Sequence, residues 1–193
     1  NTVYNSLDNK RIGWGIKKVK NSEPEVPASQ QELLEKYNAF YMDKSKQKKI
    51  YLTFDEGYEN GYTAKILDTL KEKNVKAVVM ACNTTSAITY ETLKNKYNFK
   101  IYPIIQSVCS TLANLNGVKR LGIIGTPATI KSHAYSNEIA KYNSAMQVFE
   151  LPAPNWVKIV EEHRINQPQS ILQVKEILET MKNFEPDKIV LAC

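Results

Sequence analysis

Short apolar runs alternate with amphipathic segments from about residue 50 to the end of the chain. The runs, such as residues 77–82 and 121–124, lack polar alternation, which is typical of parallel strands buried on both faces. The longer segments between them repeat apolar residues at three- and four-residue spacing, which indicates helices. The predicted strands are residues 50–54, 75–81, 100–105, 120–124, 146–151 and 188–193. The predicted helices are residues 61–73, 86–97, 107–115, 128–141, 156–164 and 170–181.

This alternation predicts an α/β fold built from right-handed strand–helix–strand crossovers. We expect a parallel sheet of five or six strands with helices on both faces, a three-layer arrangement of the flavodoxin or Rossmann kind. Residues 1–46 form a predicted irregular N-terminal arm, because prolines interrupt it and only residues 30–41 show a helical pattern. Residues 47–193 form the predicted α/β domain.

Composition and charge narrow the function classes only slightly. The chain has 193 residues and a net charge of +6, and residues 1–50 hold ten Lys and Arg against six Asp and Glu. A solvated basic arm explains this excess more simply than an anionic cell-wall or nucleic-acid partner, so we expect no nucleic-acid partner. No apolar run reaches about 18 residues, so we expect no membrane span.

The cysteine and histidine counts argue against disulfides and metals. The chain has three cysteines (Cys82, Cys109 and Cys193), an odd number, and it is large enough to build a core without disulfides. This favours free thiols over disulfides, and therefore a cytoplasmic location. The two histidines have no ligand spacing, so we expect no metal site built from this chain.

Polar residues stand where the predicted strands end. Ligands of open α/β sheets bind at the carboxyl ends of the strands, so these residues are the candidate site. They are Asp55, Cys82, Asn83, Thr84, Thr126 and Cys193. Asp55 suits a catalytic base but equally a solvated acid, and Thr126 suits an anion contact or a plain strand-to-helix turn.

Cys82 is the most informative of these residues because it ends a strand and precedes a helix. The N–H groups of a helix N-terminus favour a thiolate, and those near Asn83 and Thr84 suit a carboxylate. With Cys193 on the same edge, two opposed thiols could remove and return a proton on the two faces of a small chiral ligand. On spacing alone, buried structural cysteines remain the commoner alternative. Cys109 lies among apolar neighbours and is expected to be structural.

Residues 1–80 resemble polysaccharide deacetylases that act on peptidoglycan, of the delta-lactam-biosynthetic de-N-acetylase type. The matching segments are residues 14–17 and 50–63, which include Thr53-Phe54-Asp55-Glu56-Gly57. The resemblance implies that Asp55 is a catalytic base in an exported enzyme. The family's His-x-x-x-His ligand pair is absent from this sequence, so metal-dependent deacetylation is not expected.

Residues from about 75 to 193 resemble glutamate racemase. The matching segments are residues 81–87, 123–130, Ser132 with Tyr135, and 189–193. The resemblance implies a cofactor-independent enzyme acting on glutamate, with Cys82 and Cys193 as the two catalytic thiols. Asn83, Thr84 and Thr126 are the expected substrate contacts. The family's opening Asp-Ser-Gly loop and its Pro-Tyr-Gly contact have no match.

Together the two resemblances suggest a composite chain with a seam near residues 70–80. The leading hypothesis is a glutamate-racemase-like isomerase with a role in peptidoglycan and cell-wall biosynthesis. We expect its activity to be weak or lost, since a terminal carboxylate beside Cys193 disfavours the thiolate. The alternatives are a peptidoglycan de-N-acetylase fragment, which is a hydrolase, and a non-catalytic hybrid or designed α/β scaffold.

Overall fold

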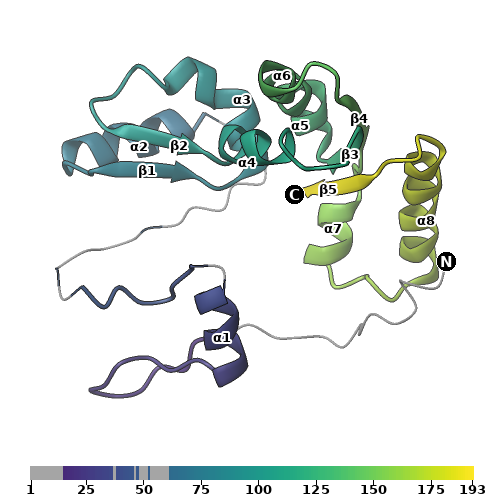
Figure 1. Cartoon of the computed structure of the whole chain (residues 1–193). Helices are drawn as coiled ribbons and strands as arrows, with labels where there is room; N and C mark the ends of the chain where they lie inside the picture. The colour runs from purple at the N-terminus through teal and green to yellow at the C-terminus, as the bar shows by residue number, and fades with distance from the viewer. Residues whose placement is uncertain (1–14, 37, 46, 48–51, 53–60) are drawn as a thin grey trace. The chain divides into compact units, whose positions relative to one another are not determined.

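A computed structural model of the chain describes residues 15–36, 38–45, 47, 52 and 61–193. The chain divides into two units, Asn1–Leu52 and Thr53–Cys193 (Figure 1). In the first unit, the described residues include helix α1 (Ala28–Lys36) and an antiparallel bridge between Lys17 and Glu25. The strand predicted at residues 50–54 lies outside the described residues, apart from Leu52.

The second unit alternates helices and strands as the sequence predicts, and its strand pairs are all parallel. The strands are β1 (Ala77–Met80), β2 (Lys100–Pro103), β3 (Arg120–Gly125), β4 (Gln147–Pro152) and β5 (Lys188–Ala192). The helices are α2 (Thr63–Glu72), α3 (Asn83–Leu93), α4 (Ile104–Leu112), α5 (Pro127–Lys131), α6 (Ala134–Tyr142), α7 (Trp156–Glu161) and α8 (Pro168–Asn183). The parallel α/β class is confirmed.

The five described strands form two sheets and not the single sheet that we expected. One sheet pairs β1 with β2, and the other has the order β4-β3-β5 (Figure 1). An apolar run identifies a strand but not its neighbour, because pairing depends on how the connecting helices pack. Here α4 and α6 pack against each other, as do α3 and α5, so helices join the two sheets.

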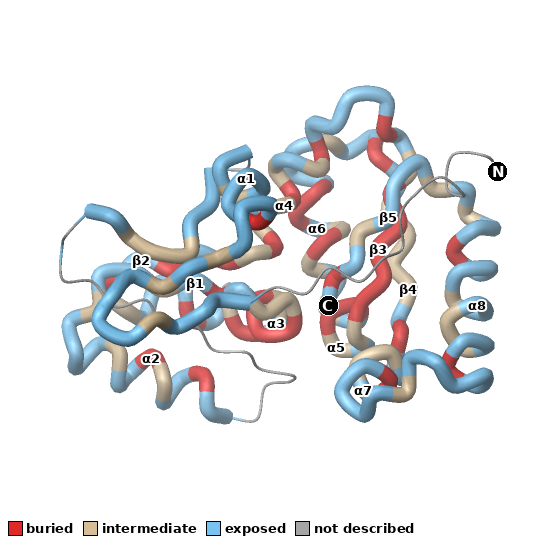
Figure 2. The backbone as a smooth tube through the Cα atoms, turned by 90° about the horizontal axis from the view of Figure 1, so that it is seen from below, coloured by how far each residue is buried: buried red, intermediate tan, exposed pale blue. Residues whose placement is uncertain are grey.

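The β4-β3-β5 sheet has helices on both faces. On one face, Leu121 and Ile123 of β3 share a buried cluster with residues of α4 and α6. On the other face, Ile124 packs with Met181 of α8, and a side chain at Gly122 would collide with the sulfur of Met181. Figure 2 shows the resulting burial along β3 in red. The expected three-layer arrangement is present around this sheet.

Among the described residues, the β1-β2 sheet is covered on one face only. Met80 and Ile101 are buried with Leu67 of α2 and Leu93 of α3. The alternate side chains, Val79 at 67% and Tyr102 at 42% exposure, face away from this cluster. None of the helices among the described residues is long and apolar enough to span a membrane.

The helix predicted at residues 128–141 is two helices, α5 and α6, separated by a corner at Ser132 and His133. His133 has φ of 52°, in the left-handed region, which interrupts the helical path. The Ser132 hydroxyl donates to the carbonyl of Thr129 (2.6 Å) and accepts from the N–H of Ala134 (3.2 Å). Apolar spacing is continuous through the corner, so periodicity alone did not reveal it.

Candidate active site at the carboxyl ends of the strands

Cys82 lies between β1 and α3, where it is the N-cap residue of the helix. Its backbone is extended (φ −76°, ψ 125°), and its carbonyl accepts the first helical hydrogen bond from the N–H of Ser86 (2.9 Å). The side chain is half-buried. The first N–H groups of an α-helix have no partner within the helix, so the thiol stands beside donors that suit an anionic ligand.

Three threonine hydroxyls meet where α3 and α5 begin. Thr84 Oγ1 lies 3.0 Å from Thr126 Oγ1 and 3.2 Å from Thr129 Oγ1, and the last two oxygens are 3.0 Å apart. Thr126 is also the N-cap of α5, since its hydroxyl accepts from the N–H of Thr129 (3.2 Å). Because α3 follows β1 and α5 follows β3, this triangle brings together the carboxyl ends of strands from both sheets.

Tyr135, the second residue of α6, holds the side chain of Asn83. The Tyr135 hydroxyl donates to Asn83 Oδ1 at 2.7 Å. Tyr135 is 2% exposed, and burial, followed by the charge of Cys109, raises its pKa to about 12. The hydroxyl therefore keeps its proton over the working pH range of most enzymes.

Cys193 follows β5 and lines a pocket of about 400 Å³. The pocket is lined by Ile124, Gly125, Thr126, Ala153, Trp156, Val157, Val160, Glu161, Leu191 and Cys193. Burial raises the pKa of the Cys193 thiol, and the negative charges of Cys82 and Glu161 raise it further. Thr126 in the same lining contacts Thr84 in the first turn of α3 (3.0 Å between the Oγ1 atoms), so the pocket of Cys193 adjoins the helix N-terminus that carries Cys82.

Most of the predicted site residues are therefore gathered at one place, and one lies outside the described residues. Cys82, Asn83, Thr84, Thr126 and Cys193 come together as expected, whereas Asp55 is not among the described residues. Sequence reasoning missed Thr129, Tyr135 as a partner of Asn83, and Glu161. Glu161 carries no signal in the sequence, because it ends a helix rather than following a strand.

Cys109 and the pair His133–Glu150 stand apart from the pocket lining. Cys109 is fully buried in α4, and burial, then the charges of Glu138 and Glu150, raises its pKa to about 12. The His133 Nδ1 atom lies 2.7 Å from Oε2 of the buried Glu150 side chain. This pair anchors the α5–α6 corner to β4. Among the described residues, no group of three or more His, Cys, Asp or Glu side chains lies close enough to hold a metal.

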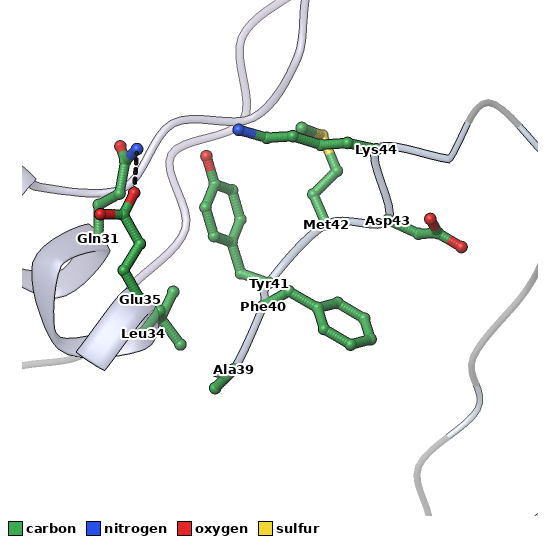
Figure 3. Close-up of a pocket in the computed structure, with 9 residues that line it drawn as sticks. All are labelled: Gln31, Leu34, Glu35, Ala39, Phe40, Tyr41, Met42, Asp43 and Lys44. Atoms are coloured by element: carbon green, nitrogen blue, oxygen red, sulfur yellow. Dashed lines mark hydrogen bonds between the residues drawn. The ribbon is translucent and has the colours of Figure 1, made fainter. Parts of the chain in front are cut away.

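The first unit has a pocket of its own, of about 510 Å³ (Figure 3). One wall comes from α1, where the Gln31 amide donates to Glu35 at 3.2 Å, and the rest comes from residues 39–44. The lining contains carboxylates, an amide and a lysine but no thiol. It therefore cannot support the chemistry that the thiols suggest.

Comparisons with known proteins show which family the chain matches. The Asp/Glu/Hydantoin racemase family model matches residues 30–193. Glutamate racemase of Trichormus variabilis is 34% identical over 128 residues, which are 66% of this chain and 43% of that protein. Glutamate racemase of Microcystis aeruginosa is 33% identical over 144 residues, 74% of this chain and 50% of the relative. The chain thus spans about half the length of the curated relatives that it matches.

Solved structures show the same likeness. Glutamate racemase of Francisella tularensis, in complex with D-glutamate, is 30% identical with a TM-score of 0.62, over 67% of this chain and 49% of that one. Glutamate racemase of Aquifex pyrophilus is 30% identical with a TM-score of 0.58, over 68% and 51%.

The chain belongs to the Asp/Glu/hydantoin racemase family. Within that family it is a glutamate-racemase-like module. The family match starts at residue 30 and runs through residues 70–80, where we expected a seam. The comparisons support neither a deacetylase segment nor a composite chain, so those two expectations find no support.

Proposed function

We propose that this module is an amino-acid racemase that inverts the Cα of glutamate by two-base proton transfer. The observation that carries the proposal is that Thr126 lines the same pocket as Cys193 while its hydroxyl lies 3.0 Å from that of Thr84, in the first turn of the helix that Cys82 caps. Two-base racemisation requires one thiolate and one thiol on opposite faces of the substrate. Burial, and then the charge of Cys82, raises the pKa of Cys193, which favours Cys193 as the thiol.

The proposed reaction needs only these two side chains. A Cys82 thiolate takes the Cα proton, so that the C–H bond breaks and an S–H bond forms while the electron pair stays on the substrate. The Cys193 thiol then gives its proton to the opposite face of Cα, and its S–H bond breaks as the new C–H bond forms. In the reverse direction the two thiols exchange roles.

Substrate binding is assigned to the polar groups beside Cys82. The N–H groups of the first turn of α3, the Asn83 amide and the Thr84 and Thr126 hydroxyls suit the substrate's α-carboxylate. The structure of the Francisella tularensis racemase in complex with D-glutamate supports glutamate as the ligand. A D-amino-acid product also fits the peptidoglycan role that the sequence resemblance implies.

The test is proton NMR of D- and L-glutamate in deuterated buffer with the whole chain. We expect thiol-dependent loss of the Cα–H signal for both enantiomers. Cys82→Ser and Cys193→Ser should each slow exchange of at least one enantiomer by about 100-fold or more, the usual contribution of a positioned base. The matched control is Cys109→Ala, which removes a buried thiol outside the pocket and should leave exchange unchanged.

Two results would contradict the proposal. Exchange that survives in both serine variants would show that other groups move the proton. A folded chain without any exchange would favour the alternative of a non-catalytic α/β scaffold.

A further inference from the structure

A hydrogen bond connects α6 with Asn83, the residue next to Cys82. The Tyr135 hydroxyl donates to Asn83 Oδ1 at 2.7 Å, between residues that are 52 positions apart in the chain. Tyr135 is 2% exposed, so its side chain is almost entirely shielded from bulk water. The side chain of Asn83, a candidate ligand contact, is therefore fixed by a residue that is not itself a candidate ligand contact.

An asparagine side chain has two faces with opposite hydrogen-bonding character. Its oxygen accepts, whereas its nitrogen donates two N–H groups, and a rotation of 180° exchanges them. The Tyr135 hydroxyl donates to Asn83 Oδ1, and burial and the neighbouring Cys109 raise its pKa to about 12, so the hydroxyl keeps its proton. With the Asn83 oxygen on the Tyr135 side of the amide, the nitrogen points away from this hydroxyl.

The corner between α5 and α6 places Tyr135 for this contact. The left-handed His133 ends the helical path of α5, and α6 begins in a new direction with Tyr135 in its first turn. The Ser132 hydroxyl and the His133–Glu150 pair hold this corner. Thr129, in α5 just before this corner, contacts Thr84, so Asn83 and Thr84 are both contacted from the segment formed by α5 and α6.

We infer that Tyr135 is a positioning residue that orients the Asn83 amide so that its N–H groups face the substrate carboxylate beside Cys82. The inference rests on the proposed function, since it assigns a task within that site. Donors that are already oriented need no rearrangement when the ligand binds, which strengthens their interaction with it.

Tyr135→Phe removes the hydroxyl and keeps the ring. We expect the KM for glutamate to rise about tenfold, the loss of roughly one hydrogen bond to a charged group, while kcat changes less. Tyr142→Phe is the matched control on α6, because Tyr142 is 51% exposed, and its KM should equal that of the unaltered chain.

A double-mutant cycle with Asn83→Ala separates positioning from a purely structural role. If Tyr135 acts through Asn83, Tyr135→Phe has no further effect on KM in the Asn83→Ala background. Additive effects in the cycle, or an unchanged KM in Tyr135→Phe, would overturn the inference. Cys82-dependent exchange in the unaltered chain, measured in the same series, shows separately whether the proposed function holds.

A binding measurement covers the case of a chain without turnover. The side-chain NH2 signals of Asn83 are assigned in a nitrogen–proton spectrum by their absence in Asn83→Ala. We expect D-glutamate to shift these signals in the unaltered chain and to shift them several-fold less in Tyr135→Phe. Absence of a shift in the unaltered chain, or equal shifts in both, would overturn the inference whatever the exchange experiment shows.

Discussion

The two sheets of the second unit are built differently, although each has a candidate catalytic thiol after one of its strands. Cys82 follows β1 of the two-stranded sheet, and Cys193 follows β5 of the three-stranded sheet. The β4-β3-β5 sheet has a central strand buried on both faces, whereas the part of the chain that the structure describes covers the β1-β2 sheet on one face only, with α2 and α3. Val79 and Tyr102 remain exposed on the other face. We therefore expect the three-stranded sheet to supply most of the unit's stability, and the two-stranded sheet to depend on its contacts with α5 and α6.

The largest expected effect compares a core residue of one sheet with an outer residue of the other. Leu121→Ala in β3, where the side chain is fully buried, should lower the free energy of unfolding by about 2–5 kcal/mol. Val79→Ala in β1, where the side chain is 67% exposed, should lower it by about 0.5 kcal/mol or less. Urea unfolding followed by circular dichroism measures both, and equal losses would break the comparison.

The next effect concerns the link between the sheets. Thr84→Val keeps the shape of the side chain but removes the hydroxyl that contacts Thr126 and Thr129. We expect a loss of about 1–2 kcal/mol in the free energy of unfolding, since the contact is buried. Glutamate exchange should also slow, because the α3 N-terminus beside Cys82 is less firmly held.

Thr84→Ser is the control for this change, since it keeps the hydroxyl. It should retain most of the exchange rate and lose stability only through the missing methyl group. If serine and valine variants behaved alike, the hydroxyl triangle would not be what connects the two sheets.

The sequence predicts the local features of the molecule better than it predicts how the two sheets are assembled. Local signals located each strand between residues 61 and 193 and each helix except for the break between α5 and α6, because apolar periodicity reports burial directly. The strand-end rule likewise brought Cys82, Thr126 and Cys193 to one place. The two-sheet pairing was missed, because it depends on how α4 packs against α6, and a strand's own residues do not specify its neighbour.

The missed site residues have similar causes. Tyr135 reaches Asn83 only because the helical path breaks at His133, and a left-handed non-glycine residue has no clear signature in a continuous apolar pattern. Glu161 lines the pocket through the placement of α7 against β3 and β5, which is a tertiary feature. The racemase resemblance identified the two thiols, while the neighbours that shape their chemistry required the fold.

The smallest expected effect concerns the amino-terminal end of the three-stranded sheet, opposite the candidate site. Asp187, just before β5, accepts hydrogen bonds from the N–H groups of Lys119 (2.7 Å) and Arg120 (2.8 Å) at the start of β3. These hydrogen bonds lower the pKa of the Asp187 carboxyl below its ordinary value of 3.8. A lowered pKa in the folded state means that the carboxylate stabilises the fold above pH 3.8, and that this contribution is lost as the pH falls through the folded pKa.

Asp187→Asn should therefore be slightly less stable than the unaltered chain at pH 7, and the difference should narrow in acid. Amide hydrogen exchange provides the local measurement, since β5 amides should lose protection in the variant at neutral pH while β2 amides keep theirs. Equal loss in both strands would mean that the two sheets open together, and the contrast between a self-supporting sheet and a dependent one would then be wrong.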